Sequence, residues 1–96
     1  MELPEAIELV ESLPAAYVLL GSDGKYLYKG ACRDLKERLR DHCAGRASRT
    51  KNRRPLRVFH FEYCGSYSDA LKREKYFKSR FGRVFLKRLL EKRLSS

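Results

Sequence analysis

The sequence predicts a single small α+β domain in which a mainly antiparallel sheet of three strands is flanked by helices. The chain has 96 residues, near the size at which one hydrophobic core can be stable without metal or disulfide bonds. Runs rich in aromatic and branched residues alternate with segments whose apolar residues recur at helical spacing. An Asp-Gly pair between the first two runs favours a tight hairpin, which makes neighbouring strands antiparallel.

The chain is expected to begin with an amphipathic helix over residues 3–13. Four glutamates lie at three-residue spacing on one face of this segment. Pro4 is tolerated in a first helical turn, and Pro14 ends the helix. We therefore predict an N-terminal helical extension, residues 1–14, attached to a main domain, residues 15–96. The apolar face consists of Leu3, Ala6, Ile7, Val10 and Leu13.

Two strands joined by a hairpin should follow. Residues 15–21 form a continuous apolar run, which is typical of a strand buried on both faces. Tyr17 is the only residue of this run whose side chain has a polar, ionisable group. A second extended segment contains Tyr28 and is expected to turn at Gly30, where the missing Cβ allows a sharp bend. Tyr17 and Tyr28 should then lie on adjacent antiparallel strands.

A helix is predicted directly after the second strand. Asp34 and Glu37 have the spacing of a capping box at its start. Arg38 and His42 lie one helical turn apart on a flank of the apolar stripe. The strand and the helix therefore bring a tyrosine, an arginine and a histidine into one neighbourhood. The stripe itself consists of Leu35, Leu39 and Cys43.

The charge of the chain indicates a polyanionic partner. The formal net charge is +10, with −4 on the first sixteen residues and +14 on the remainder. A domain this basic favours nucleic acid, although a solvated basic surface is the alternative. Gly45 should end the preceding helix, and the basic loop that follows could neutralise phosphates or be a surface loop without a ligand. The candidate nucleic-acid-binding residues are Arg46, Arg49, Lys51, Arg53 and Arg54 in this loop, together with Lys29 beside Tyr28.

A third strand is predicted over residues 56–64. Strict alternation places Phe59, Phe61 and Tyr63 on one face and His60 on the other. We interpret His60 as a surface or rim histidine rather than a catalytic one.

Two further helices should complete the domain. Ser66 and Asp69 predict the start of the first, and Gly82 is expected to separate it from the second. Glu74 falls on the apolar face of the first helix, where a carboxylate is costly unless it is paired or binds a cation. A salt bridge to an arginine competes here with a metal-binding or catalytic role. The apolar face contains Tyr67, Ala70, Leu71, Phe77 and Phe81.

The remaining features predict a cytoplasmic protein with no membrane partner. The three cysteines lack the paired spacing of a zinc site, so we interpret them as reduced thiols. No apolar run approaches membrane-spanning length, and glutamates stand where a secretory signal would carry basic residues.

The ordered set of tyrosines, arginine, histidine and glutamate resembles the GIY-YIG nuclease family over residues 15–90. The two tyrosine motifs appear as Ala15-Ala16-Tyr17 and Tyr28-Lys29-Gly30. Arg38, His42 and Glu74 fall where members of the family have their helix arginine, a following histidine and the metal-binding glutamate. Alanines replace Gly-Ile before Tyr17, Lys29 replaces an apolar residue, and no asparagine follows Glu74 as in several members. The length is similar to that of small standalone members.

The resemblance implies metal-dependent endonuclease activity on DNA, with repair or the processing of structured DNA as the expected roles. It implies that Glu74 binds Mg²⁺ or Mn²⁺ and that Arg38 pairs with phosphate oxygens. Tyr17 would orient or deprotonate the attacking water, which requires a lowered phenol pKa. Tyr28 would hold water or phosphate, and His42 could accept the proton; which tyrosine acts as the base stays open.

Two other functions are compatible with the same residues. A non-catalytic nucleic-acid-binding module would keep the fold and the basic surface without cleaving anything. A structural RNA-associated protein would need only the basic loop.

Overall fold

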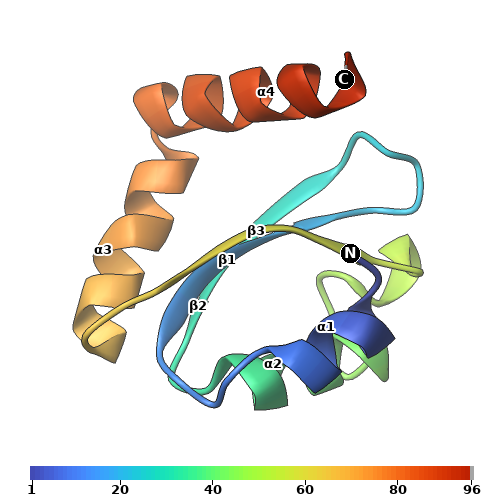
Figure 1. Cartoon of the computed structure of the whole chain (residues 1–96), viewed down its shortest axis with the longest axis vertical. Helices are drawn as coiled ribbons and strands as arrows, with labels where there is room; N and C mark the ends of the chain where they lie inside the picture. The colour runs from blue at the N-terminus through green and yellow to red at the C-terminus, as the bar shows by residue number, and fades with distance from the viewer. Residues whose placement is uncertain (96) are drawn as a thin grey trace.

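The computed structural model describes residues 1–95 and confirms the predicted α+β class (Figure 1). The sheet has the order β2-β1-β3, and both strand pairs are antiparallel. No helix within these residues is long and apolar enough to cross a bilayer. In chain order the elements are α1 (Leu3–Leu9), β1 (Ala15–Leu20), β2 (Leu27–Cys32), α2 (Leu35–Cys43), the 3₁₀ helix η1 (Lys51–Arg53), β3 (Arg57–Tyr63), α3 (Tyr67–Lys78) and α4 (Arg80–Leu94).

The sheet separates two hydrophobic clusters. Figure 1 shows α1 and α2 together on one side of the sheet, with α3 and α4 on the other. Tyr17 and Leu19 of β1 pack with residues of α1 and α2, whereas Ala16 and Val18 pack with Phe77 of α3 and with α4. As predicted, β1 is therefore buried on both faces, and its side chains alternate between the two clusters.

The hairpin forms as predicted, but the chain does not turn at Gly30. The turn lies at Gly24, which has a φ of +73°, and Asp23 accepts hydrogen bonds from the following backbone. β2 continues through Gly30, which lies opposite Tyr17. A Cβ at Gly30 would approach the Tyr17 hydroxyl to 2.6 Å. The glycine therefore provides room for the tyrosine ring rather than for a bend.

The first two helices agree with the sequence in position, but α1 is shorter than predicted. α1 ends at Leu9, four residues earlier than expected, and the chain then continues extended so that the carbonyl of Leu13 can accept a hydrogen bond from the backbone N–H of Leu35. Asp34 caps α2 by accepting from the backbone N–H of Glu37, as predicted. Gly45, with a φ of +80°, follows the end of α2.

A β-bulge makes the predicted alternation along β3 wrong. Val18 pairs with His60, but the next residue, Leu19, pairs with Val58, so Phe59 is the extra residue. Phe59 packs in the α3–α4 cluster, and Phe61 packs against the other cluster. The aromatic residues of β3 are thus divided between the two faces because one inserted residue reverses the parity.

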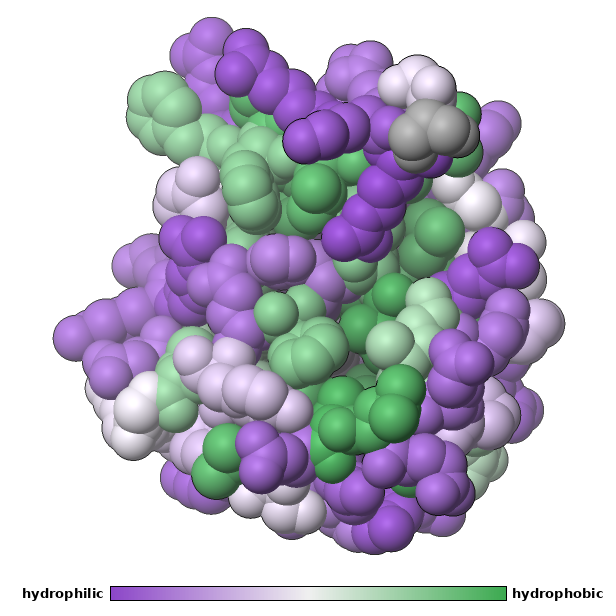
Figure 2. Space-filling model, viewed as in Figure 1, coloured by the Kyte–Doolittle hydropathy of each residue, from purple (hydrophilic) through white to green (hydrophobic). Residues whose placement is uncertain are grey.

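The outer edge of β3 is partly covered by the N-terminus. The backbone of Met1 exchanges hydrogen bonds with Val58, at 2.7 and 3.3 Å. Figure 2 shows hydrophilic side chains over most of this side of the molecule and hydrophobic ones gathered over β3, between α1 and α4. A shallow hollow there is lined by Met1, Val58, Phe59, His60, Phe61 and Arg93.

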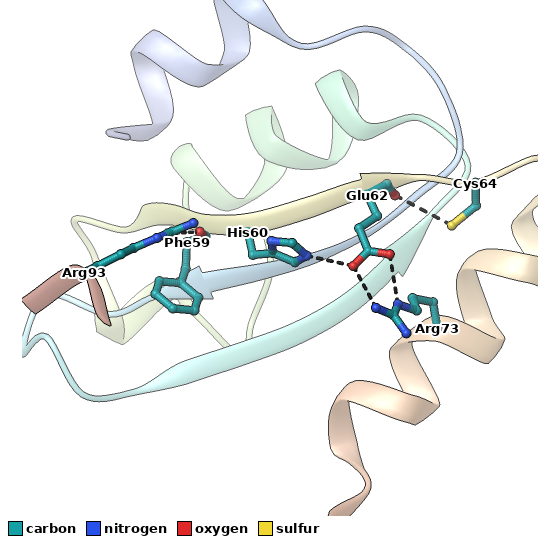
Figure 3. Close-up of polar contacts among 6 residues, drawn as sticks. All are labelled: Phe59, His60, Glu62, Cys64, Arg73 and Arg93. Carbon is teal, nitrogen blue, oxygen red and sulfur yellow. Dashed lines mark hydrogen bonds and ion pairs between the residues drawn. The ribbon is translucent and has the colours of Figure 1, made fainter. Parts of the chain in front are cut away.

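The two C-terminal helices meet at Ser79 rather than at the predicted Gly82. Ser79 ends α3, and its side chain caps α4 by accepting from the backbone N–H of Gly82. Gly82 lies inside the first turn of α4, where a Cβ would be 1.8 Å from the carbonyl oxygen of Tyr76. Arg93, near the end of α4, lies over the Phe59 ring and donates to the Phe59 carbonyl (Figure 3).

Candidate active site

Three buried side chains form a continuous hydrogen-bonded chain beneath the sheet. The Tyr17 hydroxyl of β1 lies 2.8 Å from His42 Nε2 of α2. His42 Nδ1 lies 2.7 Å from the Oγ1 atom of Thr50, which precedes η1. Tyr17 and His42 are each 1% exposed, and Thr50 is fully buried. The strand, the helix and the basic loop therefore meet at one polar chain inside the core.

The hydrogen-bond network determines the direction of this chain. The Thr50 hydroxyl donates to the carbonyl of Ala47 at 3.5 Å, so its oxygen can accept from His42 Nδ1–H. A neutral imidazole protonated on Nδ1 has a lone pair on Nε2. We therefore assign the Tyr17 O–H as the donor to His42 Nε2.

Tyr28 packs against both rings from the neighbouring strand. Its ring centroid lies 6.2 Å from that of Tyr17 and 5.3 Å from that of His42. Tyr28 is half-buried, whereas the other two side chains are buried. It is thus the solvent-facing member of the aromatic group, and the prediction that the two tyrosines lie on adjacent antiparallel strands is confirmed.

The charges of Arg38 and Glu74 both act on the Tyr17 hydroxyl. Burial raises the pKa of Tyr17 well above its ordinary value; Arg38 opposes this shift, and Glu74 adds to it. Burial, followed by Arg38, lowers the pKa of His42 to about 4. The expectation of a lowered phenol pKa is wrong because desolvation outweighs the nearby guanidinium. Near pH 7 both Tyr17 and His42 are neutral.

Glu74 lies at the margin of the core rather than within it. Its side chain is 21% exposed, and a carboxylate oxygen lies 3.3 Å from the ammonium group of Lys78, one turn later. Leu71 and Phe81, expected to surround it with apolar surface, are 41% and 77% exposed. The bend at Ser79 changes the direction of the chain before Phe81, so the predicted apolar face does not continue past α3.

The acidic groups present suit a hard cation that needs few protein ligands. Within residues 1–95 no group of three or more histidine, cysteine or acidic side chains could hold a metal ion. Mg²⁺, however, is commonly bound through one or two carboxylates together with water and substrate phosphate. Glu74 can supply one such carboxylate, provided that Lys78 gives up its contact.

The basic loop is an ordered structure, and three of its cations already have partners. Arg46 Nε donates to Asp41 at 2.9 Å, and Arg53 lies 4.0 Å from Asp23. Arg54 donates to the carbonyls of Cys43 and Lys51. The side chains of the loop lie largely on the surface around the buried Thr50. The five predicted phosphate-binding cations of this loop are Arg46, Arg49, Lys51, Arg53 and Arg54.

Lys29 lies apart from the other predicted site residues. It pairs with Val18, whose side chain faces α3 and α4, so Lys29 is on the opposite face of the sheet from Tyr17 and Tyr28. Arg38 and Glu74, but not Lys29, are among the charges that act on the Tyr17 hydroxyl.

His60 belongs to a separate polar network on the α3 side of the sheet (Figure 3). Its Nε2 atom lies 2.8 Å from Glu62, which Arg73 binds through two hydrogen bonds of 2.9 and 3.1 Å. The ring of His60 also packs edge-on against Phe77 of α3 and Phe85 of α4. These contacts support a structural histidine, in line with the non-catalytic interpretation.

Two cavities border this region. One, of about 570 Å³, lies between α1 and residues 51–56, and none of the five predicted catalytic side chains lines it. A smaller hollow of about 200 Å³ opens beside Arg38. The charge of Arg38 acts on both Tyr17 and His42. The lining residues of the smaller hollow are Cys32, Arg33, Asp34, Glu37, Arg38, Asp41 and Tyr67.

Thr50 is the residue of this site that sequence reasoning missed. It lies eight positions after His42, in a loop that reads as exposed and basic. No helical or strand period connects the two residues. The one available signal was chemical: a buried histidine needs a partner for its second ring nitrogen.

Comparison with known proteins gives a consistent assignment. Residues 14–88 match the GIY-YIG catalytic domain. A UPF0213 protein of Listeria innocua is 46% identical over 63 residues, which cover 65% of this chain and 69% of that protein. Similar proteins of Syntrophus aciditrophicus and Haloquadratum walsbyi are 42% and 39% identical over 64 residues, covering 65% and 66% of this chain and 72% and 71% of theirs. No solved structure matches. With most of its length accounted for by that domain, the chain belongs to the GIY-YIG family.

Proposed function

We propose that this protein is a metal-dependent endonuclease that hydrolyses phosphodiester bonds in DNA, acting on nicked or branched DNA during repair or processing. The family suggests a nuclease, and the site suggests how it would work. The observation that carries the proposal is the Tyr17 hydroxyl, hydrogen-bonded to a neutral histidine and lying in the fields of Arg38 and Glu74.

The tyrosine–histidine pair is suited to remove a proton from water without forming a free phenolate. As water attacks phosphorus, its proton passes to the Tyr17 oxygen while the tyrosine's own proton moves to His42 Nε2. A new P–O bond forms, the bond to the leaving oxygen breaks, and that oxygen takes a proton from solvent. Phosphate binding beside Arg38 would weaken the effect of that arginine on His42 and make the imidazole a better acceptor.

The remaining side chains position the substrate. Arg38 would pair with the non-bridging oxygens, where negative charge develops. Tyr28, half-buried beside both rings, would contact the water or phosphate. Glu74 would hold Mg²⁺ or Mn²⁺, which when bound polarises the phosphate and stabilises the leaving oxygen.

Thr50 acts as a positioning residue in this scheme. By accepting from His42 Nδ1–H it keeps the lone pair of Nε2 directed at Tyr17. Because Thr50 lies within the basic loop, this bond connects the phosphate-binding candidates to the proton acceptor.

A non-catalytic nucleic-acid-binding module is the second candidate. The Glu74–Lys78 ion pair favours it, because the carboxylate proposed for the metal already has a cationic partner. The two functions differ in whether the wild-type protein cleaves DNA and whether that cleavage requires Glu74.

A cleavage assay with a matched variant separates them. Wild type and Glu74→Gln would be incubated with nicked, branched and single-stranded DNA, with Mg²⁺ or with EDTA. The proposal expects Mg²⁺-dependent cleavage by wild type and binding without cleavage by the variant. Glu91→Gln is the control, because it removes one carboxylate from an exposed position on α4. Absence of cleavage by wild type on all substrates, with binding retained, would leave only the module.

A further inference from the structure

A basic groove lies between β2 and α4, separate from the basic loop. It has a volume of about 290 Å³. Four cations line it, with three leucines between them and no acidic side chain in the lining. The lining residues are Lys25, Leu27, Lys29, Arg83, Leu86, Lys87 and Leu90.

The arrangement of these cations is unfavourable without an anion. Lys29 is half-buried, and its pKa is lowered by burial and then by the positive charges of Arg83 and Lys78. A bound anion would relieve this repulsion. The groove is therefore prepared for negative charge in a way that a scattered basic surface is not.

The groove lies on the face of the sheet opposite Tyr17 and Tyr28, and α3 connects it to the proposed site. Lys78 of α3, whose charge acts on Lys29, forms the ion pair with Glu74. A series of three cations, Lys78, Lys29 and Arg83, therefore leads from Glu74 to the groove. This series would attract a polyanion that is also bound at Glu74.

We propose that the β2–α4 groove binds the sugar-phosphate backbone of a nucleic-acid strand on one side of the scissile bond. The proposal rests on the proposed function for the position of that bond. Arg83 and Lys87 are one helical turn apart, about 6 Å along the axis of α4, so they can contact successive phosphates of an extended strand. Two half-buried leucines of the groove, Leu27 and Leu90, offer an apolar surface to the sugars and bases, as expected for single-stranded or frayed nucleic acid.

The salt dependence of binding tests the groove. The Arg83→Ala/Lys87→Ala double variant would be compared with Arg88→Ala/Lys92→Ala, which removes the same charge from exposed positions of α4 outside the groove. Affinity for a fluorescently labelled nicked duplex would be measured by anisotropy in EDTA over a range of salt concentrations, and thermal unfolding would confirm that both variants fold.

Loss of two phosphate contacts makes the negative slope of log K against log salt shallower by roughly 1.4 to 1.8. We expect this change for the groove variant and a slope near that of wild type for the control. Equal slopes for the two double variants would overturn the proposal. Cleavage is measured separately. If the wild-type protein cleaves DNA and the two double variants have equal salt slopes, the groove proposal alone is refuted. If the wild-type protein does not cleave DNA but only the groove variant has a shallower salt slope, the proposed hydrolysis alone is refuted.

Discussion

Replacement of Thr50 by valine removes a hydroxyl that accepts a hydrogen bond from His42 and donates a longer one, of 3.5 Å, to the carbonyl of Ala47. Valine has nearly the same shape, so the packing of this fully buried position is retained. His42 Nδ1–H, which donates to Thr50 at 2.7 Å, is left without a partner. The variant therefore measures the contribution of the Thr50 hydroxyl to stability and to the tautomer of His42.

The expected cost follows from the burial of both groups. A buried donor left unsatisfied costs about 1–3 kcal/mol in the free energy of unfolding. For a domain of this size each kcal/mol corresponds to a shift of roughly 4–8 °C in the melting temperature. The imidazole can escape part of the cost by moving its proton to Nε2 and donating to the Tyr17 oxygen, which reverses the direction of the remaining bond.

Two measurements check this prediction. Thermal unfolding gives the loss of stability, and ¹⁵N NMR of the imidazole nitrogens gives the tautomer. We expect the Nδ1–H form in wild type and a substantial Nε2–H population in Thr50→Val. Thr50→Ser is the control, because it keeps the hydroxyl and loses only a methyl group worth about 1 kcal/mol. Unchanged stability and an unchanged tautomer in Thr50→Val would refute the hydrogen-bonded chain.

Three further predictions concern the same region. Gly30→Ala should lower the free energy of unfolding by roughly 1–3 kcal/mol in urea titrations, because its Cβ would lie 2.6 Å from the Tyr17 hydroxyl. Gly65→Ala is the control, because the nearest atom to its Cβ would be 3.6 Å away. An equal effect of the two substitutions would contradict the close packing of Gly30 against Tyr17. Because the pKa of His42 falls from 6.5 to about 4 on folding, stability should be full above pH 6.5 and decrease by about 3 kcal/mol as the pH falls to 4. In urea titrations at several pH values, the His42→Gln variant should lose less stability between pH 6.5 and pH 4 than wild type. An identical loss in both proteins would exclude His42 as its source. Lys78→Gln should reduce the Mg²⁺ concentration for half-maximal cleavage about twofold, since an i,i+4 ion pair is worth roughly 0.3–0.5 kcal/mol, and an unchanged requirement would show that Lys78 does not compete for Glu74.

The sequence predicted the helix caps, the hairpin and the buried strand correctly, because each depends on residues close together in the chain. The caps at Asp34 and Ser66 and the hairpin at Gly24 were visible in the sequence because each depends on residues only a few positions apart. The buried β1 strand was visible because both of its faces are apolar.

The errors arose where contacts between distant segments determined the outcome. Gly30 and Gly82 were expected to break elements, yet each makes room for a side chain or carbonyl from another element. The bulge at Phe59 reversed the parity of β3, which no regular period can indicate.

The candidate site shows the same division. The order and spacing of Tyr17, Arg38, His42 and Glu74 identified the family, but they did not predict the surroundings of each side chain. The raised pKa of Tyr17 depends on burial by the assembled core, and the partner of His42 comes from a loop with no sequence signature.

The most direct test of the account is whether Tyr17, Arg38 and Glu74 surround a single metal–phosphate centre. Paramagnetic broadening by Mn²⁺ can be measured by NMR on the protein bound to a cleavage-resistant phosphorothioate oligonucleotide. The account predicts that signals of these three residues broaden together at the lowest Mn²⁺ concentrations. Broadening centred on other carboxylates, with Tyr17 and Glu74 unaffected, would contradict it.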